Sequence, residues 1–222
     1  MAEHVASRGT EKRTRLAPAE RRSQLIALGV EMLATRTLDE LSVEDIAVKA
    51  GISRGLLFHY FASKQEFHVE VARAAAAELI ARTEPDPAAA PLDALRDGLA
   101  AFVDYVAENP DNYKSLVRGA ASGDADMRAI FDATRARMAG RVIDNLGELG
   151  LPLDASAELA VHGWVAFVEE CVIRSIEARA SGTGEHTRDG LLDLLANALP
   201  ALVFAAAGDA AAGLPAALSG QE

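Results

Sequence analysis

The chain has 222 residues, half of them hydrophobic, and a formal net charge of −11. This length suits one or two domains with a buried core. The single cysteine, Cys171, excludes an intramolecular disulfide and favours a reducing compartment, the cytoplasm. No apolar run approaches the roughly 20 residues of a membrane span, and the first eight residues lack the apolar core of a secretion signal. We therefore expect a cytoplasmic protein with no membrane partner.

The acidic charge is unevenly distributed. Residues 1–64 contain 10 basic and 8 acidic side chains, whereas residues 65–222 contain 12 and 25. Salt screens charges beyond about 8 Å, so local charge governs attraction to phosphate. Six basic residues crowd the N-terminal region: Arg8, Lys12, Arg13, Arg15, Arg21 and Arg22. We expect residues 1–17 to form a disordered arm, which either stays in solvent or touches nucleic acid.

The segment from Pro18 to Gly51 predicts two helices. Pro18 suits the first turn of a helix, and large apolar residues repeat at helical spacing behind it. Ser42 and Asp45 form an S-x-x-D start, in which the serine hydroxyl can accept a hydrogen bond from a first-turn amide. Gly51 follows the last apolar position, where a left-handed C-cap suits glycine. The second helix should therefore end at this glycine.

A third helix follows after a tight turn. Ser53 can cap it, and it should run to about Tyr60 with Leu57 turned inward. Two short helices joined in this way over about residues 42–61 form a helix-turn-helix. This module places its second helix in the major groove of DNA.

The outer face of the third helix carries the candidate DNA contacts. Gly55 is a poor helix former, so its position near an exposed helix start suggests close approach to a base or a backbone. Lys64 lies just past the helix and suits a phosphate. The expected contacts are Ser42, Ser53, Arg54, Gly55, Leu56, His59, Tyr60 and Lys64. The alternative is an ordinary helical hairpin whose polar face only meets solvent.

Residues 18–82 resemble the DNA-binding domain of the TetR (tetracycline-repressor-like) family of bacterial regulators. The resemblance is carried by residues 41–47, 50–53, 56–61 and 63–66. It implies double-stranded DNA as a partner, a homodimer, and a ligand-binding and dimerisation domain over residues 83–207. One departure is Phe58, where the family often has tyrosine. The missing hydroxyl removes a phosphate contact that is sometimes made there.

The remaining sequence predicts helices only, so the fold class is all-α with about nine helices. Ser63 and Glu66 form a capping box for a fourth helix to about residue 83, which joins the two domains. A proline-rich break precedes a fifth helix, and Asn109-Pro110 starts a sixth. Three further helices are expected over about 124–149, 154–180 and 185–207. Residues 208–222 are rich in alanine and glycine and should form a mobile tail.

The last two predicted helices carry more apolar surface than a single core-facing stripe requires. The excess favours burial against a second copy, and the family resemblance implies the same interface. The expected interface residues are Ile176, Leu191, Leu195, Leu199 and Leu202. A two-fold dimer would place two recognition helices about one DNA turn apart on a palindromic operator. The alternative is burial within one chain.

The resemblance also implies a ligand cavity among the fifth to eighth helices. The candidate lining residues are Phe102, Tyr105, Tyr113, Leu116, Phe131, Thr134, Met138, Trp164, Phe167 and Cys171. Their aromatic character favours an unidentified small, mostly apolar ligand. The five histidines lack metal-ligand spacing, and neither a Walker loop nor a GxSxG motif is present, so we expect no metal, no cofactor and no catalytic residues.

Three functions remain open at this point. The first is a ligand-responsive dimeric repressor that leaves a palindromic operator when the ligand binds. The second is a transcription factor of the same fold that activates, or that responds to a protein partner. The third is an enzyme or carrier that merely contains a helical hairpin. Such an enzyme would need a set of catalytic residues.

Overall fold

The computed structural model of the chain describes residues 17–151, 153–184 and 186–207. Nine α-helices and no strands lie in these ranges, which confirms the all-α prediction. The helices are α1 (Pro18–Met32), α2 (Val43–Ala50), α3 (Arg54–Tyr60), α4 (Lys64–Arg82), α5 (Pro91–Glu108), α6 (Pro110–Ala121), α7 (Ala125–Glu148), α8 (Ala155–Ala180) and α9 (Arg188–Ala207). The predicted disordered arm, apart from residue 17, and the predicted mobile tail lie outside the described residues.

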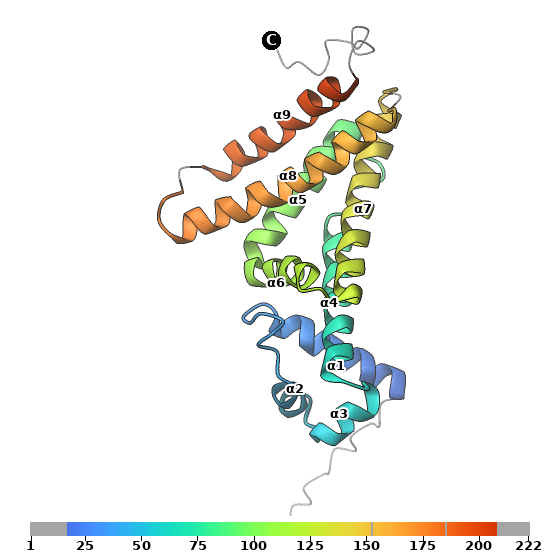
Figure 1. Cartoon of the computed structure of the whole chain (residues 1–222), viewed down its shortest axis with the longest axis vertical. Coiled ribbons are helices and arrows are strands. Elements are labelled where there is room, and N and C mark those ends of the chain that lie inside the picture. Colours follow the sequence, from blue (N-terminus) through green and yellow to red (C-terminus); the bar gives the residue numbers. More distant parts are fainter. Residues whose placement is uncertain (1–16, 152, 185, 208–222) are drawn as a thin grey trace, which may run out of the picture.

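Helices α1, α2 and α3 gather at one end of the molecule around the first half of α4 (Figure 1). Their core contains Leu25, Ile46, Leu57, Phe61 and Phe67, all nearly inaccessible to solvent. Helices α1 and α4 approach closely at Gly29, because a Cβ atom there would lie 2.5 Å from a methyl carbon of Val71. This packing fixes the direction in which α4 leaves the helix-turn-helix.

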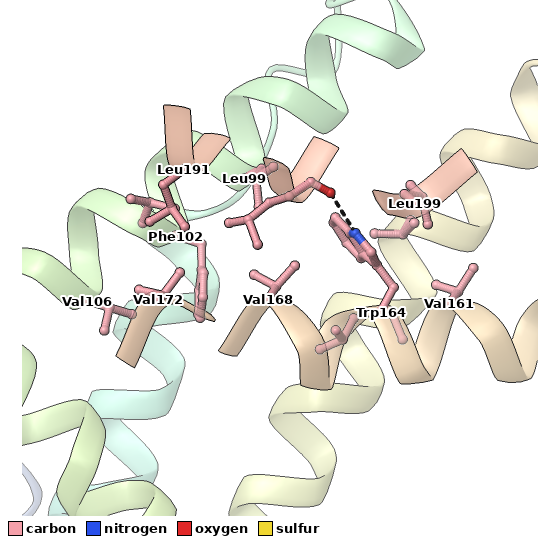
Figure 2. Packing of buried hydrophobic residues seen from close by; sticks show 14 of the residues in the cluster. Leu99, Phe102, Val106, Val161, Trp164, Val168, Val172, Leu191 and Leu199 are labelled. Atoms are coloured by element: carbon pink, nitrogen blue, oxygen red, sulfur yellow. Dashed lines mark hydrogen bonds between the residues drawn. The ribbon is translucent and has the colours of Figure 1, made fainter. Parts of the chain in front are cut away.

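Helices α5 to α9 form a second bundle around the far end of α4, and α9 lies along α8 (Figure 1). The bundle core includes Phe102, Val106, Trp164 and Val168, shown in Figure 2. The indole Nε1 of Trp164 donates to the carbonyl oxygen of Leu195 at 2.8 Å (Figure 2). Trp164 therefore ties α8 to α9 as well as filling the core.

The two helical groups are connected by more than α4. Leu116 on α6 and Met127 and Ile130 on α7 pack into the core of the N-terminal group. The backbone amide of Leu38 donates to Oγ of Ser115 at 3.3 Å. Residues beyond 82 thus complete the core of the helix-turn-helix region, and the corner between α6 and α7 is a second mechanical link between the two groups.

Helix α9 departs from the expectation that no segment could span a membrane. Within the described part of the chain, residues Arg188–Ala206 form a helix that is long and apolar enough to cross a bilayer by length and composition alone, with mean hydropathy 1.5. Helices in the cores of soluble proteins can be equally long and apolar. Only 22% of this helical segment is buried inside the chain, so much of its apolar surface faces outward.

Candidate nucleic-acid interface and ligand cavity

The ends of α2 and α3 are set by local hydrogen bonds. Oγ of Ser42 accepts from the Asp45 amide at 3.0 Å, and Oγ of Ser53 accepts from the Leu56 amide at 3.2 Å. Gly51 ends α2 with φ of 64°, in the left-handed region that favours glycine. These three features shape the predicted turn, and Ser42 and Ser53 have structural roles whether or not they meet DNA.

The outer face of α3 is open to solvent. Arg54, Gly55, Leu56 and His59 are exposed, as is Lys64 at the start of α4. Tyr60 is half-buried and packs partly against the core of the N-terminal group. The structure therefore places most of the predicted DNA contacts on one accessible face, with Tyr60 at its edge.

Nothing inside the protein requires glycine at position 55. A Cβ atom there would meet only Oγ of Ser53, at 4.0 Å. A glycine costs a helix about 1 kcal/mol relative to alanine, and no close packing offsets that cost here. This geometry is consistent with close approach of an external surface to the start of α3.

Two residues outside the predicted site contact Arg54. The guanidinium of Arg54 pairs with the Glu44 carboxylate at 2.9 Å and lies 5.6 Å from the centre of the Phe58 ring. From the sequence, Phe58 stands out only for the hydroxyl that it lacks. Glu44 and Arg54 are ten residues apart, so helical periodicity could not have shown their pairing.

Helix α4 is anchored to the N-terminal group by polar contacts. Arg22 on α1 pairs with Glu66 and Glu70 on α4, at 3.5 and 3.1 Å. The His68 ring is buried, and its Nε2 atom lies 2.9 Å from the Leu41 carbonyl oxygen. Burial lowers the pKa of this imidazole. A neutral imidazole that donates through Nε2 fits this position. Movement of α4 would therefore be transmitted to α1 and to the segment before α2.

A cavity lies where the C-terminal end of α4 meets α5, α7 and α8. Its empty volume is about 590 Å³, including the part that opens to solvent. Most of its wall is apolar, contributed by Leu99, Phe102, Val142, Trp164 and Val168, among others. A mostly apolar lining with a few polar groups is typical of small-molecule sites.

Three of the ten predicted cavity residues line this space: Phe102, Met138 and Trp164. The other seven, Tyr105, Tyr113, Leu116, Phe131, Thr134, Phe167 and Cys171, are not in its wall. Leu116 and Phe131 pack toward the N-terminal core, and the Thr134 hydroxyl donates to the Ile130 carbonyl of its own helix. These residues face other parts of the fold because one apolar stripe of a long helix contacts several different neighbours along its length.

Polar side chains at the cavity were largely missed from the sequence. Glu169 on α8 accepts from the Tyr113 hydroxyl at 2.7 Å and pairs with Nε of Arg135 at 2.9 Å. Burial raises the pKa of Glu169, and burial together with the neighbouring carboxylate raises that of Tyr113. Arg141, Asn145 and Glu169 line the wall. These residues are spread over α6, α7 and α8, so no local motif marks them.

The predicted dimer residues divide into two groups. Leu191, Leu195 and Leu199 are buried inside the chain between α9 and its neighbours. They cannot also form an exposed interface, which corrects their assignment. Ile176 is half-buried, while Leu202 is 39% exposed and Leu194 is 47% exposed. Leu159 on α8 is 71% exposed, so an apolar face remains on this pair of helices.

No group of three metal-ligating side chains occurs in the ranges that the structure describes. Two family models match the chain: "Bacterial regulatory proteins, tetR family" over residues 25–71, and "Tetracyclin repressor-like, C-terminal domain" over residues 91–202. The second alone spans half of the chain. The two matches cover both helical groups.

The chain is also similar to known transcriptional regulators. The HTH-type transcriptional repressor KstR2 of Mycolicibacterium smegmatis is 41% identical over 80 residues, which is 35% of this chain and 39% of KstR2. The HTH-type transcriptional activator FasR of the same organism is 28% identical over 114 residues, 49% of this chain and 50% of FasR. The chain thus matches half or less of the length of these curated relatives.

A crystal structure of a tetR-family transcriptional regulator from Streptomyces coelicolor superposes with a TM-score of 0.74 at 26% identity, over 86% of this chain and 84% of that one. The match therefore includes the helices around the cavity as well as the helix-turn-helix. Together with the two family models, it shows that the chain belongs to the TetR family of bacterial regulatory proteins.

Proposed function

We propose that the protein is a dimeric, DNA-binding transcriptional repressor that acts in the cytoplasm and leaves a palindromic operator when a small, mostly apolar molecule binds. The observation that carries the DNA-binding part is the exposed face of α3, where Arg54 contacts Glu44 and the Phe58 ring. The ligand-binding part is supported by the apolar cavity, whose wall includes Thr83 and Pro85 just past the end of α4.

The cavity and the DNA face are connected through α4. Helix α4 packs against α1 in the N-terminal group and against α5 and α7 in the second bundle. A ligand weakens DNA binding only if it prefers a conformation in which the two recognition helices of a dimer do not fit adjacent major grooves. Linkage then requires operator DNA to weaken ligand binding by the same factor.

An activator of the same fold is the second candidate. The relative FasR is named an activator, whereas KstR2 is named a repressor, so relatives of both kinds resemble this chain. Activators and repressors would share the same DNA face and cavity. Transcription of the neighbouring gene with and without the protein distinguishes the two.

The DNA-binding proposal predicts that Arg54→Ala loses about 1–3 kcal/mol of affinity for operator DNA, because a guanidinium that reads guanine contributes about that much. Affinity for random DNA should fall much less. Electrophoretic shifts on the DNA that flanks the gene, beside a scrambled duplex, measure both. Arg73→Ala, an exposed arginine on α4, is the matched control and should leave both affinities unchanged. Equal affinities of wild type and Arg54→Ala for operator would remove the base-reading role.

The ligand proposal predicts that an inducer changes the fluorescence of Trp164, the only tryptophan, which lies in the cavity wall. At a hundredfold excess over its dissociation constant, the inducer should raise the free energy of unfolding by about 2.7 kcal/mol. It should also release operator DNA. A screen of small apolar molecules by thermal shift, followed by DNA release, tests this. A molecule that binds beside Trp164 but leaves DNA affinity unchanged contradicts ligand gating.

A further inference from the structure

The neutral polar groups deep in the cavity wall already have partners inside the protein. The indole of Trp164 donates to the Leu195 carbonyl oxygen at 2.8 Å. The hydroxyl of Thr83 donates to the Leu79 carbonyl oxygen at 2.9 Å. A ligand that hydrogen-bonded to either group would replace an existing hydrogen bond, so the exchange would add little to affinity.

The charged groups of the wall are engaged in the same way. One carboxylate oxygen of Glu169 accepts from the Tyr113 hydroxyl, and the other pairs with Arg135. Nη1 and Nη2 of Arg141 on α7 donate to carbonyl oxygens at the C-terminal end of α4. Nε of Arg141 has almost no accessible surface, so the cavity does not reach it. A carbonyl or carboxylate group buried here would lose its hydration without gaining a free donor.

The exposure of the lining residues shows on which side the cavity meets solvent. The lining residues of α8, which include Trp164, Val165 and Val168, are all buried. The half-buried lining residues come from α5, α7 and the segment after α4: Pro85, Leu95, Gly98, Met138, Arg141 and Asn145. The cavity is therefore closed at α8, and its rim lies between α5, α7 and the end of α4.

Gly98 leaves space at this rim. A Cβ atom there would have the Thr83 carbonyl oxygen at 3.7 Å and no other packing neighbour within 4 Å. Glycine is unfavourable in the interior of a helix, and no close packing requires it in the middle of α5. A larger side chain at this position would extend toward the end of α4 and narrow the opening.

We propose that the ligand is an amphiphile, whose hydrocarbon chain enters past Gly98 and packs against Leu99, Phe102 and Trp164 while its polar head group stays hydrated at the rim. This inference rests on the ligand-responsive function proposed above. The buried wall selects the ligand by chain length, because each methylene group removed from water contributes to binding. It does not select the head group, because the head group remains in solvent.

Binding to the wild-type protein tests where the head group lies. The probes are 1-octanol, octanoate and octyltrimethylammonium, which share an eight-carbon chain and differ in charge, and the shorter 1-hexanol. Trp164 fluorescence reports binding at about 0.15 M salt, where exposed charges are screened. We expect the dissociation constants of the three eight-carbon probes to agree within about threefold. 1-Hexanol should bind about fifteenfold more weakly than 1-octanol, because it buries two fewer methylene groups.

Gly98→Leu tests the entrance. Its side chain should fill part of the rim and weaken 1-octanol binding about tenfold. Gly147→Leu is the matched control, because Gly147 is an exposed helix glycine on α7 where an added Cβ atom would meet nothing within 4 Å. This control should bind 1-octanol as the wild type does. A folded Gly98→Leu protein with unchanged affinity for 1-octanol would overturn entry past Gly98.

The wild-type measurements separate the inference from the function on which it rests. Dissociation constants that differ more than tenfold among the three eight-carbon probes would place the head group inside the cavity and overturn the inference, while the ligand site would stand. Binding as expected without release of operator DNA would support the binding mode and contradict ligand gating. If no probe changes Trp164 fluorescence, both the inference and the ligand site fail.

Discussion

Leu202→Glu is expected to separate the dimer into monomers that remain folded and to lower operator affinity by about a hundredfold or more. Leu202 and Leu194 are exposed on α9, beside the apolar face of α8. A buried carboxylate at a dimer interface is unfavourable because it loses its hydration without gaining a partner. A monomer binds each half-site of the palindrome separately. It therefore lacks the high effective concentration that favours the second binding event of a dimer. Sedimentation and operator titration measure the two effects.

Two control variants accompany Leu202→Glu. Leu92→Glu changes a leucine of similar exposure at the start of α5 and should leave both the dimer and DNA binding intact. Leu195→Glu places a charge at a fully buried position and should unfold the chain, so it cannot report on the interface. A Leu202→Glu protein that sediments as a dimer and binds the operator normally would place the interface elsewhere. A wild-type monomer that binds a palindrome tightly would reject the dimer.

Arg135→Met is expected to destabilise the protein by about 3 kcal/mol, because it leaves the buried carboxylate of Glu169 without its cation. Removing one partner of a buried pair typically costs about 3–5 kcal/mol. The lower end applies because the Arg135 side chain is 30% exposed and water screens part of the pair. Denaturant unfolding at fixed protein concentration measures the effect. Arg137→Met is the control, since this arginine is exposed on the same helix.

The size of the effect should depend on pH. Burial raises the pKa of Glu169, and loss of Arg135 raises it further. A carboxyl group with a raised folded-state pKa contributes stability below its unfolded pKa and loses that contribution as the pH rises through the folded value. The deficit of Arg135→Met should therefore be largest at neutral pH and shrink toward acidic pH. Adding Glu169→Leu should recover much of the stability. A deficit that is independent of pH and remains in the double variant would show that lost packing, not charge, is responsible.

The helix-turn-helix could be predicted from sequence because its signals are local. The caps at Ser42, Ser53 and Ser63 and the left-handed Gly51 each depend on residues within a single turn, and the structure places each one as predicted. The all-α class follows in the same way from apolar periodicity and helix breaks. The exposed face of α3 could be inferred by elimination, once its inward residues had been assigned.

Only the tertiary structure decided which neighbour each apolar face meets. Periodicity shows that Leu195 and Leu202 lie on apolar parts of α9, but not that α8 covers the first and leaves the second exposed. The polar groups of the cavity depend on the fold in the same way. Arg141 meets the end of α4 from about 60 residues away, and Glu169 meets Tyr113 from another helix. Such contacts arise from helix packing, which a pattern with a period of 3.6 residues does not encode.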